Sequence, residues 1–159
     1  AKSVGFNEAG DWTGVMFAFY SAVAALYSLL IPKIAKAIGR KKVYSFSLLL
    51  GGIGLISMML VEDKNVLLLS ISGVGLAWAA ILAMPYAMLS GSLPADKMGV
   101  YMGLFNATIT LPQITAGILG STLIAFFGGN PMTIIVIAGV SMLIAGLAVF
   151  LVKQNSDTE

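Results

Sequence analysis

The stretch MTIIVIAGVSMLIAGLAVFLV, residues 132–152, contains no charged side chain. A helix of about 20 such residues crosses the roughly 30 Å hydrocarbon core of a bilayer, because each residue adds about 1.5 Å. Strands of a transmembrane barrel would alternate apolar and polar residues over about ten positions, which this stretch does not do. Four further apolar segments precede it, at residues 12–31, 43–61, 66–89 and 99–127. The sequence therefore predicts an all-α membrane protein with five transmembrane helices in a single domain, residues 1–159.

The composition leads to the same class and excludes several others. Hydrophobic residues make up 58% of the 159 residues and charged residues only 10%, with a mean hydropathy of +0.97. A soluble core of this size cannot bury so much apolar surface, and a signal peptide has only one short apolar region. Cysteine and histidine are both absent, which removes thiol chemistry and imidazole catalysis. We expect no enzymatic activity, no cofactor, no metal ion and no binding to nucleic acid.

The distribution of basic residues predicts the orientation in the membrane. The segment KIAKAIGRKK, residues 33–42, holds five basic residues and no acidic one, and such loops stay on the cytoplasmic side. We expect a multi-pass protein of the plasma membrane or bacterial inner membrane with a cytoplasmic C-terminus. Alternation along the chain then places seven of the nine basic residues in the cytoplasm, namely Lys33, Lys36, Arg40, Lys41, Lys42, Lys97 and Lys153.

Local signals predict where the helices end. The polar segment AKSVGFNEAGDW, residues 1–12, is typical of a loop. Lys33 and Lys36 are expected on an amphipathic extension of the first helix, because a lysine stem can lie along apolar surface while its ammonium group reaches water. The segment GGNP, residues 128–131, predicts a tight turn in which Asn130 caps the last helix and Pro131 occupies its first turn.

One helix carries uncharged polar groups along a single face. At 100° per residue, seven residues of the segment 99–127 fall within an arc of roughly 100°. This polar stripe has two interpretations: a packing surface between helices, or one wall of an aqueous cavity in which Asn106 and Gln113 hydrogen-bond a polyhydroxylated ligand. Thr108 and Thr115 face the other way, and we expect their hydroxyls to bond a carbonyl one turn earlier. The seven residues are Gly99, Gly103, Asn106, Thr110, Gln113, Gly117 and Gly120.

Further candidate site residues lie on two other predicted helices. Trp78 lies near mid-membrane and offers either a stacking surface for a sugar ring or core packing. Tyr20 and Tyr27 share a face of the first helix and could supply hydroxyl contacts, with Ser21 and Ser28 nearby. Pro85 and Pro112 each remove a backbone hydrogen bond and are expected to bend their helices. No ionisable side chain lies well inside a predicted span, so the sequence shows no ion-coupling site.

Four segments of the chain resemble a known family of transporters. NEAGDWTG (7–14), IGRKK (38–42), WAAILAMPYAMLSGSLP (78–94) and GVYMGLFNATITLPQI (99–114) are similar to the C-terminal half of sugar:proton symporters of the major facilitator superfamily, of the sucrose and maltose transporter type. The most specific element is a Gly-x-x-Asn-x-x-Ile-x-x-Pro-Gln pattern, at Gly103, Asn106, Ile109, Pro112 and Gln113.

The basic loop is similar to the end of the superfamily's loop signature at Gly39, Arg40 and Lys41. Pro32 stands at the signature's glycine position and Lys36 at its aspartate position. This departure argues against an acid-mediated latch and leaves the expected role of the loop in orientation and anchoring intact.

The resemblance implies a fold and a function. Such transporters have twelve helices in two six-helix halves, each half built from inverted three-helix repeats. The five segments would be helices eight to twelve, one short of a half, and the partner would be the missing N-terminal half of the transporter. The implied function is proton-coupled transport of a disaccharide or related glycoside, with membrane lipid and the sugar as other partners. The alternative is a non-transporting membrane sensor or an assembly scaffold that self-associates.

Overall fold

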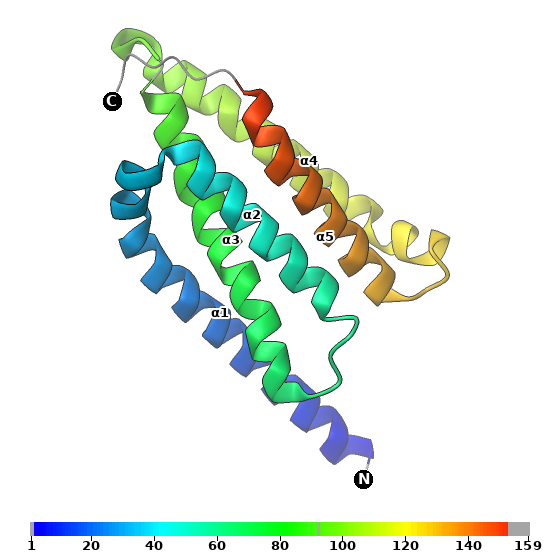
Figure 1. Ribbon diagram of the computed structural model, residues 1–159. Coiled ribbons are helices and arrows are strands. Elements are labelled where there is room, and N and C mark those ends of the chain that lie inside the picture. Colours follow the sequence, from blue (N-terminus) through cyan, green and yellow to red (C-terminus); the bar gives the residue numbers. More distant parts are fainter. Residues whose placement is uncertain (1, 92, 153–159) are drawn as a thin grey trace.

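The computed structural model describes residues 2–91 and 93–152, with side chains placed from Gly10 onward except that of Ala95. Every regular element in these ranges is helical, which confirms the predicted fold class. Two short 3₁₀ turns, η1 (Ala95–Lys97) and η2 (Val149–Leu151), precede α4 and extend α5 (Figure 1). The five α-helices are α1 (Lys2–Ile38), α2 (Arg40–Ser57), α3 (Lys64–Ser90), α4 (Met98–Phe126) and α5 (Pro131–Ala148).

Four of the helical segments are long and apolar enough to cross a bilayer, which makes the chain an integral multi-pass membrane protein. They are Gly10–Ile38, Lys64–Ser90, Met98–Phe126 and Pro131–Leu151. The remaining helix, α2, begins with Arg40, Lys41 and Lys42, so its apolar part covers only residues 43–57. The predicted second span, 43–61, is therefore too long at its C-terminal end: residues 58–61 lie beyond the last residue of α2.

The N-terminal segment differs from its prediction. Residues 2–12 continue α1 as helix and do not form a loop. No proline interrupts this part of the sequence, and extending an existing helix costs far less than nucleating a new one. At its other end α1 continues past Pro32 to Ile38, which confirms the predicted extension that carries Lys33 and Lys36. Lys153, counted above among the cytoplasmic residues, lies outside the described residues.

Short connections with specific backbone geometry join the helices. A single residue, Gly39, links α1 to α2 with a φ of 91°, a conformation that favours glycine because other residues would strain their Cβ. Asp63 caps α3 by accepting hydrogen bonds from the backbone N–H groups of Asn65 (2.7 Å) and Val66 (3.2 Å). These bonds favour the ionised form and lower the pKa of the Asp63 carboxyl group.

The turn between α4 and α5 is confirmed as predicted. Gly128 and Gly129 both have positive φ, at 80° and 75°. Asn130 caps α5 through a hydrogen bond from the Met132 backbone N–H to its side-chain oxygen, 2.9 Å, and Pro131 occupies the first position of the helix.

Helix α2 lies at the centre of the bundle, packed against α3 on one side and α5 on the other, while α1 covers α3 (Figure 1). Glycines allow these close approaches. A Cβ added to Gly52 would lie 2.7 Å from the Gly139 carbonyl oxygen of α5, and one added to Gly73 would lie 2.5 Å from the Leu50 carbonyl oxygen of α2. Small residues at such contacts let helix backbones approach closely within a membrane.

Hydrogen bonds from serine hydroxyl groups also join α2 to α5 and to α3. Ser45 of α2 is buried and donates to the Gly146 carbonyl of α5 over 2.7 Å. Ser57 of α2 donates to the hydroxyl of Ser70 on α3 over 2.8 Å. Each interhelical hydrogen bond of this kind contributes about 0.6 kcal/mol on average within a membrane. The bonds therefore fix the helix pairings in addition to the apolar packing.

Helix α4 stands apart from this arrangement. None of its residues, Met98–Phe126, is buried, and it packs lightly against α5. Its glycines also differ from those of α2: a Cβ added to Gly99, Gly103, Gly117 or Gly120 would meet nothing within 4 Å. One helix of the bundle thus presents most of its surface to its surroundings.

Candidate substrate-binding surface

The polar stripe of α4 lies on the exposed helix just described. Asn106, Thr110 and Gln113 are all exposed, and the glycines above and below them face open space. Asn106 and Gln113 are seven residues apart, so they lie about 10.5 Å from each other along the helix axis. Within the described part of the chain the glycines of this stripe pack against no other helix, unlike those of α2. A stripe of this kind offers hydrogen-bonding groups at two levels of one open face.

One residue of α3 reaches the stripe. The Tyr86 hydroxyl donates a hydrogen bond to the side-chain oxygen of Asn106. The Tyr86 ring also packs edge-on against Phe105, with a centroid distance of 5.1 Å and an interplanar angle of 85°. The bond occupies a lone pair of the Asn106 oxygen, while the amide NH₂ group still provides two donors. Tyr86 therefore both connects α3 to α4 and orients the Asn106 amide.

Sequence reasoning missed Tyr86. A signal was present, because a tyrosine within an apolar helix needs a partner for its hydroxyl group, and Tyr86 directly follows Pro85. Pro85 and Pro112 both lie inside continuous helices, α3 and α4.

The two threonines on the other side of α4 are satisfied within their own helix. The Thr108 hydroxyl donates to the Phe105 carbonyl over 2.7 Å, and the Thr115 hydroxyl donates to the Leu111 carbonyl over 2.9 Å. Both bonds confirm the prediction made for these residues. Asn106, Thr110 and Gln113 are the exposed polar side chains of the predicted stripe.

A second polar feature lies between α1 and α3. The Trp78 side chain is 43% exposed and lines a groove of about 370 Å³ together with Ser21 and Ser28 of α1. The Ser28 hydroxyl donates to the Ala25 carbonyl over 2.7 Å, which leaves its oxygen able to accept. The remaining wall is apolar, formed by Ala24, Ala25, Ala79, Leu82 and Ala83. The groove thus brings the Trp78 indole and two serine hydroxyl groups together among four alanines and one leucine.

The two tyrosines of α1 are not among the residues that line this groove. Tyr27 is hydrogen-bonded to the buried Ser47 of α2, with 2.8 Å between the hydroxyl oxygens, and it packs against the core formed around Ala24 and Ile31. Tyr20 is half-buried and contacts Phe17 edge-on, with a centroid distance of 5.8 Å. The structure places Tyr27 in the framework of the bundle, where its hydroxyl joins α1 to α2.

The basic loop anchors two other helices. Arg40 donates from Nη1 to the Ala87 carbonyl near the end of α3, over 2.9 Å. Its neighbour Lys41 donates from Nζ to the Val152 carbonyl, just after η2. Positive groups are favourable at helix C-termini, where carbonyl groups lack partners and the helix dipole is negative. Arg40 and Lys41, in the first turn of α2, therefore cap the ends of two other helical segments.

These features define a class of protein: a polytopic membrane protein built as a helix bundle, with uncharged polar groups displayed on exposed helix faces. The sequence model of the Major Facilitator Superfamily matches residues 2–159, and the chain belongs to that superfamily of membrane transporters. No curated protein and no solved structure matches the chain.

Proposed function

We propose that this chain forms part of a secondary active transporter that carries a sugar, a disaccharide or related glycoside, together with protons. The single observation that carries the proposal is the open polar face of α4, on which Asn106, Thr110 and Gln113 are exposed and a Cβ added to the neighbouring glycines would meet nothing within 4 Å. Primary amides suit a polyhydroxylated ligand, because each amide can donate to one hydroxyl group and accept from another. A membrane helix that turned these amides toward lipid would leave them unsatisfied.

The Trp78 groove supports the same class of ligand. An indole face opposite small side chains accommodates the flat apolar side of a pyranose ring, and the nearby serine hydroxyls can bond its rim. In this proposal the α4 amides and the α1–α3 groove contribute to one wall of a central site. A second helical half, related to this one by the superfamily's architecture, supplies the opposite wall, and alternating access arises as the halves rock around the site.

The proposal also includes the coupling of transport to protons and the orientation of the chain in the membrane. The described spans contain no acidic side chain well inside them, so the proton-binding carboxylates are assigned to the second half. The basic segment 33–42 and the C-terminus are assigned to the cytoplasmic side, in a plasma or bacterial inner membrane. Uptake that rises with an imposed inward proton gradient and falls on adding a protonophore is the expected result for this coupling.

The test of the substrate class is uptake of labelled sucrose and maltose by the full transporter in proteoliposomes. Asn106→Ala and Gln113→Ala are each expected to lower uptake by about tenfold or more, because a lost hydrogen bond to a buried ligand costs about 1 to 3 kcal/mol. Thr115→Ala is the matched control, since its hydroxyl bonds its own helix. Unchanged uptake in both amide variants would remove these residues from the site.

A non-transporting sensor or a self-associating scaffold is the competing outcome of the same experiment. Saturable sugar binding without any uptake would identify a sensor. Cross-linking between single cysteines placed on the open face of α4 in two copies would identify association through this face.

A further inference from the structure

One face of α1 changes from apolar to basic near the end of the helix. Leu26, Leu29 and Leu30 are 67%, 73% and 50% exposed. At 100° per residue, Lys33 and Lys36 fall with these leucines within an arc of roughly 120°, so both lysines continue the same face by one to two further turns. Both lysines are exposed. The outward surface of α1 is thus a leucine strip that ends in two cations.

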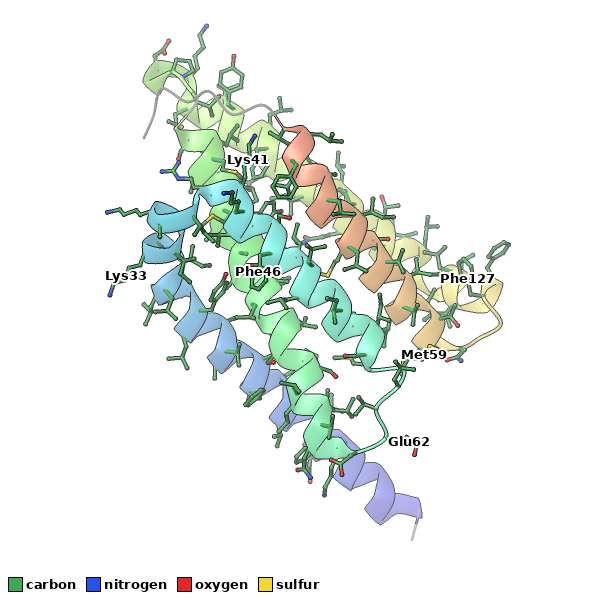
Figure 2. All side chains as sticks on the ribbon, in the orientation of Figure 1. Lys33, Lys41, Phe46, Met59, Glu62 and Phe127 are labelled. Atoms are coloured by element: carbon green, nitrogen blue, oxygen red, sulfur yellow. The ribbon has the colours of Figure 1, made fainter. Side chains whose placement is uncertain are left out.

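The surroundings of these lysines are basic as well. Gly39 turns the chain directly from α1 into α2, which places Lys42 at the same end of the bundle. Figure 2 shows Lys33 directed away from the helices at this end of the bundle, where Lys41 also lies at the start of α2. Arg40 and Lys41 donate to helix-end carbonyls, and the segment 33–42 contains no acidic residue. Lys33, Lys36 and Lys42 are therefore the exposed cations of a patch with no acid in its own segment.

The opposite end of the bundle has a different charge pattern. Glu62 and Asp63 precede Lys64 there, and Figure 2 shows Glu62 far from Lys33. The Lys64 ammonium lies 5.3 Å from the centre of the Trp12 ring, in a cation–π contact. Lys64 thus lies beside two acidic residues of its own segment, whereas the lysines of the segment 33–42 have no acidic neighbour in theirs.

We propose that Lys33 and Lys36, with the strip formed by Leu26, Leu29 and Leu30, bind an anionic phospholipid of the surrounding leaflet. The ammonium groups pair with a headgroup phosphate whose charge no headgroup cation neutralises, while an acyl chain lies along the leucines. Clusters of basic residues next to a membrane helix attract anionic lipids in this way. The leucines select a lipid over free phosphate, because inorganic phosphate gains nothing from apolar surface.

The test measures which lipids stay bound to the purified protein. Native mass spectrometry after exchange into mixed phosphatidylglycerol and phosphatidylcholine micelles is expected to show preferential retention of phosphatidylglycerol. The double variant Lys33→Gln/Lys36→Gln is expected to weaken this binding on the order of 30-fold, at roughly fivefold per cation. Lys64→Gln, which removes one positive charge at the other end, is the matched control and is expected to leave binding unchanged.

Three further measurements separate lipid binding at this surface from a folding defect, from binding of phosphate alone and from binding through charge alone. Lys33→Arg/Lys36→Arg is expected to keep the binding, since it retains the charge, and its elution on size exclusion reports on folding. Inorganic phosphate at millimolar concentration is expected not to displace the lipid. Replacing Leu29 with serine is expected to weaken lipid retention. Equal retention of both lipids by the wild-type protein, or unchanged retention in the Lys33→Gln/Lys36→Gln protein, would overturn the proposal.

Discussion

The Tyr86 hydroxyl on α3 donates its proton to the side-chain oxygen of Asn106 on α4, and this is the hydrogen bond that ties the polar face of α4 to the rest of the bundle. The Tyr86 ring supports the same connection by packing on Phe105. The residue with the clearest potential for ligand binding is thus held from a neighbouring helix.

Replacing Tyr86 with phenylalanine removes the hydroxyl and keeps the ring contact with Phe105. We expect a loss of about 0.6 kcal/mol in stability, the average for an interhelical hydrogen bond in a membrane protein. Sugar uptake is expected to show a raised KM, because the Asn106 amide is no longer oriented. Thermal unfolding in detergent and transport kinetics check the two effects, with Tyr101→Phe as the control at an exposed position of α4. Identical kinetics in Tyr86→Phe and wild type would contradict an orienting role.

The glycines of the bundle are expected to differ in how much stability is lost when each is replaced by alanine. Gly52→Ala places a methyl group 2.7 Å from a carbonyl oxygen of α5, and overpacking of this kind costs about 1 to 3 kcal/mol. Gly117→Ala on α4 meets open space and is expected to leave the thermal midpoint unchanged or slightly raised. Comparable destabilisation by both substitutions would indicate that the α4 face is a packing surface.

Labelling of single cysteines tests whether the polar face of α4 contacts water. The chain contains no native cysteine, so each introduced thiol is unique within it. Gln113→Cys is expected to react readily with a membrane-impermeant maleimide. Leu111→Cys, about 160° away around the same helix, is expected to react slowly because it faces lipid. Equal reactivity at positions 111 and 113 would argue against a wet cavity.

The Asp63 cap is expected to make stability depend on pH. Its pKa in the folded protein is lowered because its carboxylate accepts the Asn65 and Val66 backbone N–H groups. Its contribution is therefore present above the ordinary aspartate pKa of about 3.9 and is lost as pH falls through the lower folded-state value. Thermal unfolding between about pH 6 and pH 3 is expected to show a smaller decrease for Asp63→Asn, which keeps a capping oxygen that does not titrate. If the stability of Asp63→Asn falls with pH as much as that of the wild type, the Asp63 carboxylate is not the source of the pH dependence.

Much of the fold can be predicted from the lengths of the apolar segments and from the residues at their ends. The helices at 66–89 and 99–127 were predicted to within two residues, because each coincides with a long apolar run of the sequence. Residues 2–12 were predicted wrongly as a loop, since polarity alone does not end a helix when no proline intervenes.

The contacts of the candidate site are harder to predict. Periodicity placed Asn106, Thr110 and Gln113 on one face, and the structure has them all exposed. Periodicity predicted no partner for any of the three residues, because the Tyr86 contact depends on how α3 and α4 are rotated against each other. The same limit applies to Tyr27: its position on a shared face with Tyr20 was evident, whereas its bond to Ser47 depends on where α2 lies.

Arg40 and Lys41, neighbours in the first turn of α2, donate hydrogen bonds to carbonyl groups at the ends of two other helices, α3 and α5. Helix α1 is joined to α2 by the Tyr27–Ser47 hydrogen bond. Hydrogen bonds and close packing thus link these four helices to one another. Helix α4 makes few contacts with them among the described residues, so a ligand bound to its polar face would displace it at the lowest cost in broken contacts.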